Sequence, residues 1–189
     1  MKTIYLILFT VMLLKANNEE IANAINNISA KSGLDRSIYY TLISVETGFK
    51  PYSIGLIADT KMVKRLENLK EFFEIKKSSY GKKYLVSIHA TNEENIIKLA
   101  EALYPININF DAGLMQISKQ HLTQEELKKI FNPEYNIAKG NNILFDCAKR
   151  FKEIHKTIEC YNKGYQISSF NYYSKFLSHY RRHFGDTNI

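Results

Sequence analysis

The sequence has few of the residues that build metal centres. It contains two cysteines in 189 residues, and these do not form a CxxC motif. Its five histidines show no ligand spacing with a carboxylate partner, as a zinc site would require. We therefore expect no metal site.

Basic runs interleaved with glycine and aromatic residues, typical of nucleic-acid-binding proteins, are also missing. The formal net charge is +7, so the expected partner is an anionic polymer such as cell wall, or an anionic membrane surface, and not nucleic acid. Internal repeats and low-complexity segments are absent. With 45% apolar and 24% charged residues, the chain has the composition and length of one globular domain.

A long hydrophobic run is lacking too, because the apolar stretch from Ile4 to Leu14 is shorter than the roughly 20 residues of a transmembrane helix. Lys2 precedes this stretch and the small residue Ala16 follows it. The pattern predicts a signal peptide over residues 1–16 and an exported protein of the periplasm or cell envelope. The alternative is an uncleaved membrane anchor. No cysteine lies near the boundary to carry a lipid.

Export would place Cys147 and Cys160 in an oxidising compartment, where disulfides persist. Cys147 falls in one expected helix and Cys160 near the start of the next, so a helical hairpin would bring them together. The alternative is a pair of buried free thiols.

Helical patterns dominate both ends of the mature chain, residues 17–189. Residues 19–32 form an amphipathic pattern that ends at Gly33, and Asp35 and Gly48 have the residue types that begin and end a second helix. Later helices are expected from Pro133, around residues 160–162 and over residues 173–184.

The pattern changes between residues 60 and 105. It predicts a helix over 62–73, strands over 74–79 and 83–89, and a helix over 93–104. Thr91 and Glu94 are expected as a capping box for the last helix. We interpret 60–105 as a self-contained α-β-β-α insert in a helical frame. The expected fold class is therefore α+β, mainly α.

Glu46 lies on the apolar face of the helix predicted over 35–48, at helical spacing from Tyr39, Leu42 and Ile43. A carboxyl group in such surroundings loses hydration, and its pKa rises toward the range where it can donate a proton near neutral pH. The alternative is a glutamate that reaches water or pairs with a lysine.

Three motifs follow the segment from Glu46 to Pro51: Gly-Leu-Met-Gln at residues 113–116, Asn-Ile-x-x-Gly at 136–140 and Tyr-Asn-x-Gly at 161–164. In this order they resemble the lysozyme-like lytic transglycosylases of bacteria. The resemblance covers residues 21–170 apart from the insert. It is closest to the small exported branch attached to type IV secretion and conjugation systems, which the paired cysteines also resemble.

The resemblance implies a lysozyme-like helical core and makes Glu46 the catalytic acid. It implies substrate contacts for seven residues: Thr47, Gly113, Met115, Gln116, Asn136, Tyr161 and Asn162. Thr47 stands where the family has serine. Asn136 has an alternative function as a structural cap or turn residue. Tyr161 is expected to position Glu46 or the sugar through its hydroxyl.

The implied reaction cleaves the MurNAc-β-1,4-GlcNAc bond of peptidoglycan. Glu46 acts as the single acid and base, the C6 hydroxyl of the sugar attacks C1, and a 1,6-anhydro product forms without a cofactor. We expect a monomer that opens the wall for a secretion or conjugation apparatus. The insert is expected to bind the apparatus, and the alternatives are that it caps the cleft or holds the enzyme inactive. One alternative is a hydrolytic muramidase in which Asp111 activates water, although Asp111 is expected as a turn residue. The other is a wall-binding scaffold with little catalysis.

Overall fold

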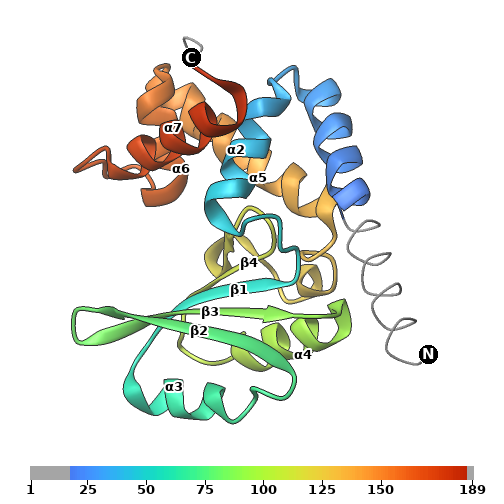
Figure 1. The fold of residues 1–189 in the computed structure, drawn as a ribbon, viewed down its shortest axis with the longest axis vertical. Coiled ribbons are helices and arrows are strands. Elements are labelled where there is room, and N and C mark those ends of the chain that lie inside the picture. The colour runs from blue at the N-terminus through green and yellow to red at the C-terminus, as the bar shows by residue number, and fades with distance from the viewer. Residues whose placement is uncertain (1–17, 187–189) are drawn as a thin grey trace.

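The computed structural model describes residues 18–186, in which helices gather at one end of the molecule and a sheet lies at the other (Figure 1). The predicted signal peptide, residues 1–16, lies outside the described residues. The helical half contains a helix at residues 18–32 and four others: α2 (Arg36–Glu46), α5 (Pro133–Phe151), α6 (Ile154–Lys163) and α7 (Asn171–Phe184). The expected mainly α, α+β fold class is confirmed.

The sheet half contains five antiparallel strands in the order β2-β3-β1-β4-β5, with two helices packed on them. Its elements are β1 (Ser53–Ala58), α3 (Thr60–Glu67), β2 (Phe73–Tyr80), β3 (Lys83–Ala90), α4 (Glu93–Leu103), β4 (Phe110–Ala112) and β5 (Ile117–Ser118). Two short 3-10 helices, η1 (Lys119–His121) and η2 (Glu125–Lys128), lead into α5.

The α-β-β-α order of the segment 60–105 is as predicted, but the segment is continuous with the sheet of the frame. Strand β3 pairs with β1 over six residues, from Ser53 opposite His89 to Ala58 opposite Tyr84. Strand β1 then pairs with β4 on its other edge. The insert therefore completes a sheet that begins before it and ends after it.

The ends of two helices in this segment differ from the prediction. Helix α3 begins earlier, because the Asp59 side chain accepts the Met62 backbone N–H, and it ends at Glu67 because the chain turns to pair Phe73 with Ala90. Helix α4 is capped by Asn92, whose side chain accepts the Asn95 N–H, so the expected capping box is wrong.

One hydrophobic core runs through both halves. Leu42 and Ile43 of α2 are fully buried, as are Val86 and Ile88 of β3, and Leu114 lies in the same cluster. The two halves are thus held together by apolar contact.

The predicted disulfide is confirmed. Cys147 of α5 and Cys160 of α6 are joined, with their Cα atoms 5.8 Å apart. The alternative, a pair of free thiols, is wrong.

Within residues 18–186, no helix combines the length and apolar character needed to cross a membrane. In the same range, no three His, Cys, Asp or Glu side chains are grouped so that they could hold a metal ion.

Reduction of the disulfide is expected to lower the free energy of unfolding by about 3 kcal/mol, because the unfolded chain regains the entropy of a closed loop. The cysteines are 13 residues apart in sequence. Urea unfolding with and without dithiothreitol measures this change. The double variant Cys147→Ala/Cys160→Ala is the control and should not respond to dithiothreitol. Coinciding unfolding curves for the wild type in both conditions would contradict the expectation.

Candidate active site

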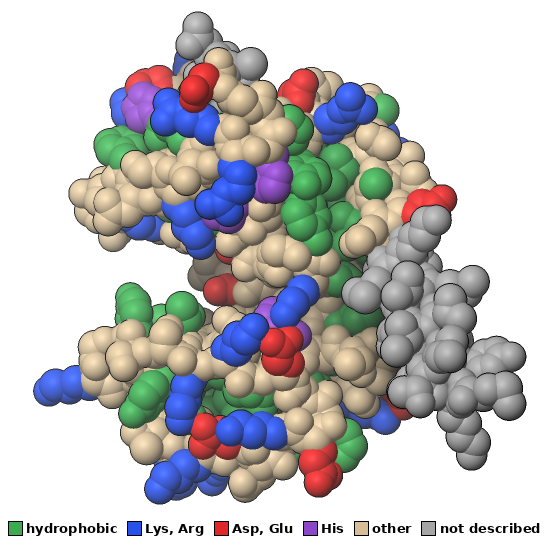
Figure 2. Space-filling view, viewed as in Figure 1, with side chains coloured by type: hydrophobic (Ala, Val, Ile, Leu, Met, Phe, Trp, Pro, Cys, Tyr) green, Lys and Arg blue, Asp and Glu red, His purple; other side chains and the backbone are tan. Residues whose placement is uncertain are grey.

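A cleft separates the helical half from the sheet half, and Figure 2 shows it as a deep notch with acidic side chains at its inner end. It consists of two cavities of about 910 and 420 Å³. The two cavities have four lining residues in common: Glu46, Asp111, Gln116 and Asn162. These residues therefore lie where the two parts of the cleft meet.

Glu46 is the last residue of α2 and faces this junction. The helix begins as predicted, with the Asp35 side chain accepting the Ser37 N–H, and Gly48 turns the chain away with a φ of 58°. Tyr39, Leu42 and Ile43 are fully buried on the face that Glu46 shares. Glu46 itself is partly exposed to the cleft, and among the described residues it forms no ion pair with a lysine.

Burial raises the pKa of Glu46 from 4.5 to about 7. A hydrogen bond from Tyr172 and the charge of Lys175 lower this pKa, whereas the charge of Asp111 raises it slightly. Near neutral pH both the protonated and the ionised form are thus populated. A group in this state can both donate and accept a proton.

Tyr172 contacts Glu46 directly, since its hydroxyl donates a hydrogen bond to Glu46 Oε1. Burial, followed by the charge of Glu46, raises the pKa of Tyr172 well above its ordinary value, so the hydroxyl keeps its proton. The prediction of an aromatic helix over 173–184 missed this residue. The available signal was its spacing of four residues from Phe176, because both lie on the buried face of α7.

Glu159 holds the end of α7 that carries Tyr172. Its fully buried carboxylate accepts the backbone N–H groups of Tyr173 at 2.8 Å and of Tyr172 at 3.4 Å. Lys163 Nζ lies 2.7 Å from the same carboxylate. The N-cap residue Phe170 makes no capping bond with its side chain, so Glu159 supplies the acceptor that the first turn of α7 needs.

Asn136 lies behind the cleft, where it fastens the Gly-Leu-Met-Gln loop. Its Oδ1 accepts the Met115 N–H at 2.8 Å, and its Nδ2 donates to the carbonyls of Ala112 at 3.0 Å and Ile130 at 2.9 Å. The side chain is fully buried. These bonds agree with the structural alternative for Asn136, and its expected glycan contact stays a prediction.

Three other residues expected to contact substrate lie in this loop or against it, and none of them lines either cavity. Thr47 Oγ1 donates to the Leu114 carbonyl at 3.0 Å. Met115 is fully buried, and Gly113 has a φ of 76° with a Cβ position only 2.1 Å from Asn136 Nδ2. A side chain at Gly113 would displace Asn136. In this structure the three residues position the loop, and their expected substrate contacts stay predictions.

Gln116, Asn162 and Tyr161 do line the cleft. Gln116 Nε2 donates to the Gly113 carbonyl at 2.9 Å, which turns its amide across the junction of the two cavities. Asn162 lines both cavities and Tyr161 the smaller one. The Tyr161 hydroxyl donates to the Met115 carbonyl at 2.7 Å, so it holds the loop, and it is Tyr172 that contacts Glu46.

Asp111 was expected in a turn, which is wrong. It lies in β4, opposite Gly55 of β1 and Ser118 of β5, and its side chain lines both cavities. Burial raises the pKa of Asp111, and a hydrogen bond with Ser118 lowers it. The cleft therefore holds a second carboxyl group near Glu46.

The family model described as Transglycosylase SLT domain matches residues 23–176, which is most of the chain. Comparison with curated proteins and with solved structures finds no significant match. The matched range includes the segment from Glu46 to Pro51, the three motifs that follow it, and both Glu159 and Tyr172.

The variant Tyr172→Phe is expected to shift the pH dependence of peptidoglycan cleavage. The lost hydrogen bond lowers the pKa of Glu46 in the wild type, so its loss raises that pKa. Because a general acid acts when protonated, kcat/KM falls as the pH rises through this pKa. In Tyr172→Phe this fall in kcat/KM should occur about one pH unit higher than in the wild type. Tyr173→Phe is the control, because Tyr173 is the next residue of α7 and lines neither cavity. A fall that stays in place or moves lower would contradict the expectation.

Glu159→Gln is expected to raise the pH at which kcat/KM falls, but by less than Tyr172→Phe does, because a neutral amide holds α7 and Tyr172 less firmly. In the Tyr172→Phe background it should cause no further shift. The pH dependence of kcat/KM is measured for the single and double variants, with the exposed Glu153→Gln as control. Equal shifts in both backgrounds, or none, would show that Glu159 does not act through Tyr172.

Proposed function

The chain belongs to the Transglycosylase SLT domain family, and on this basis we propose that it is a lytic transglycosylase that cleaves the MurNAc-β-1,4-GlcNAc bond of peptidoglycan. The observation that carries the proposal is the Glu46 carboxyl, placed at the junction of the two cavities with a pKa of about 7. Members of the family are lytic transglycosylases that act on peptidoglycan.

In the first step, protonated Glu46 donates its proton to the glycosidic oxygen as the bond from that oxygen to C1 breaks. Positive charge develops on the muramyl ring, where the N-acetyl group of the substrate supports it. The carboxylate left on Glu46 accepts the hydrogen bond of Tyr172, which stabilises its charge until the second step.

In the second step, the Glu46 carboxylate removes the proton of the C6 hydroxyl while the C6 oxygen attacks C1. This bond closes a 1,6-anhydro ring and restores the protonated acid. No water is consumed. A pKa near 7 suits both steps, because Glu46 alternates between donor and acceptor within one turnover.

The cleft offers the glycan strand a path past Glu46 on both sides. The amides of Gln116 and Asn162 line both cavities, and each amide can donate and accept hydrogen bonds to acetamido or hydroxyl groups. Met115 and Asn136 hold the wall on which Gln116 lies. The strand is therefore bound by few polar groups on a fixed frame.

The cellular context belongs to the same proposal. Residues 1–16 direct export, and the enzyme acts as a monomer in the periplasm or cell envelope, where it opens the wall for a secretion or conjugation apparatus. The disulfide between α5 and α6 supports export, since such bonds persist in oxidising compartments. The motif resemblance supports the secretion-associated branch, and the insert is the surface offered to the apparatus.

A hydrolytic muramidase is the second candidate, and the position of Asp111 in the cleft favours it. In that mechanism Asp111 activates a water molecule that attacks C1, and the product is a reducing sugar. A wall-binding scaffold with little catalysis is the third.

Mass spectrometry of digested sacculi separates these candidates, because the anhydro and reducing products differ by one water. We expect 1,6-anhydromuropeptides from the wild type and from Asp111→Asn. Glu46→Gln should lower the rate by at least about 100-fold. Reducing products that vanish in Asp111→Asn would establish the muramidase. Digestion by Glu46→Gln at the wild-type rate would remove Glu46 from the mechanism, and no digestion by any protein would favour the scaffold.

A further inference from the structure

Three basic side chains line the sheet side of the larger cavity: Lys61 and Arg65 of α3 and Lys83 of β3. Lys61 and Arg65 are four residues apart and so share a face of the helix. All three residues are exposed, and among residues 18–186 none of the three forms an ion pair. We call this group the cationic wall.

Four other lysines of the same segment pair with acidic neighbours. Lys70 and Lys77 pair with Glu67, Lys76 pairs with Glu74, and Lys98 pairs with Glu94. The wall thus keeps its positive charge available to an anion from outside the protein.

Among residues 18–186, the acids that line the same cavity form no ion pair with the wall. Asp59 accepts the Met62 backbone N–H at 2.8 Å, as the N-cap of α3. Glu46 and Asp111 lie at the inner end of the cavity, where it meets the smaller one. A ligand that reaches from Glu46 toward α3 would therefore pass from acidic to basic surroundings.

Exposed apolar side chains lie beside the wall. Ile57 of β1 and Leu85 of β3 line the cavity and are 43% and 45% exposed. Figure 2 shows hydrophobic side chains along the lower edge of the notch. The surface thus combines positive charge with apolar contact, which suits a peptide better than a sugar.

We propose that the cationic wall binds the carboxylates of the stem peptides that the glycan strand carries, so that the enzyme selects peptide-bearing strands over bare glycan. This rests on the proposed function. The GlcNAc and MurNAc rings of a strand carry no charge once the lactyl group is amide-linked to peptide, and the peptides supply the carboxylates. The peptides leave the strand at the muramyl residues, next to the bond that Glu46 cleaves.

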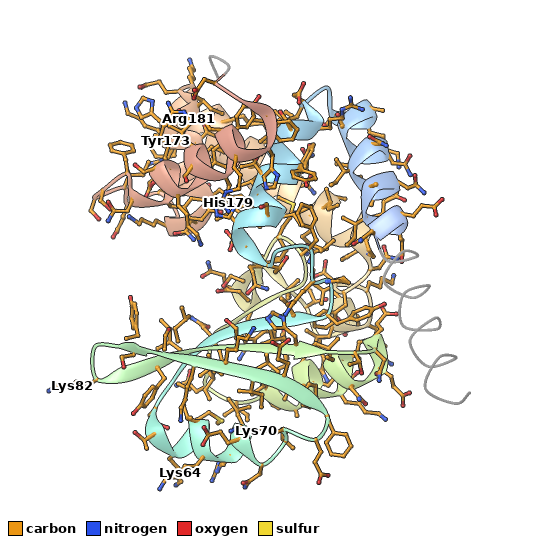
Figure 3. The ribbon with its side chains drawn as sticks, viewed as in Figure 1. Lys64, Lys70, Lys82, Tyr173, His179 and Arg181 are labelled. Atoms are coloured by element: carbon orange, nitrogen blue, oxygen red, sulfur yellow. A yellow bond between two sulfur atoms is a disulfide. The ribbon has the colours of Figure 1, made fainter. Side chains whose placement is uncertain are left out.

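The test compares two substrates: purified strands with their stem peptides, and the same strands after an amidase has removed the peptides. The variant is Lys61→Gln/Arg65→Gln/Lys83→Gln. The matched control, Lys64→Gln/Lys70→Gln/Lys82→Gln, loses the same charge from the same segment. Figure 3 places Lys64 and Lys82 at the outer surface of this half, and none of the three control lysines lines the cavity.

For peptide-bearing strands we expect the wall variant to raise KM about tenfold, because three exposed ion pairs are lost together. Its KM for stripped strands should equal that of the wild type, and the control should match the wild type on both. In the wild type, added salt should reduce the preference for peptide-bearing strands. An equal rise in KM on both substrates, or no rise on either, would overturn the proposal.

Cosedimentation of the same proteins with both kinds of strand tests the inference separately from catalysis. The wall variant should bind peptide-bearing strands more weakly than the control does, even if no protein cleaves them. Loss of cleavage with this difference intact would refute the proposed function alone. Equal binding by the wall variant and the control would refute the proposal that the cationic wall binds stem peptides.

Discussion

The carboxyl of Glu46 has to be kept from water without being neutralised by a positive charge, and much of the surrounding structure meets this requirement. Apolar residues of α2 bury the helix face up to the last residue. The partner of Glu46 is then the neutral hydroxyl of Tyr172, whereas the nearby Lys175 donates to the Val45 carbonyl at 3.3 Å. The hydrogen bond from Tyr172 lowers the pKa of Glu46 less than burial raises it, and an ion pair would have lowered it further. Glu159 extends the arrangement outward, because it fixes the turn of α7 from which Tyr172 projects.

The second constraint concerns the loop opposite Glu46. Asn136, Thr47 and Tyr161 each bond to a backbone group of the loop or its edge, so the loop is held from three elements at once. Thr47 and Asn136 thus hold the loop although they line neither cavity. Gln116, with a φ of 48°, is the residue that this frame turns into the cleft.

The sequence predicts the local features well, because their signals lie within a few residues. Asp35 and Gly48 mark the ends of α2, the face of Glu46 follows from helical spacing, and the hairpin of β2 and β3 shows alternation. Strands β4 and β5 have three and two residues, too few to show a period, and their pairing depends on distant β1. Spacing can place Tyr172 on the buried face of α7, but the sequence does not reveal the contacts of Tyr172, Asp111 and Glu159, because their partners lie far away in sequence or on another element.

The central claim is that the cleft holds the Glu46 carboxyl with a pKa near neutrality. A ¹³C NMR titration of protein labelled at the glutamate side-chain carboxyl carbon measures this value directly, and the resonance of Glu46 is assigned by its loss in Glu46→Gln. The account predicts a midpoint at about pH 7. A midpoint near 4.5, the ordinary value for glutamate, would contradict it.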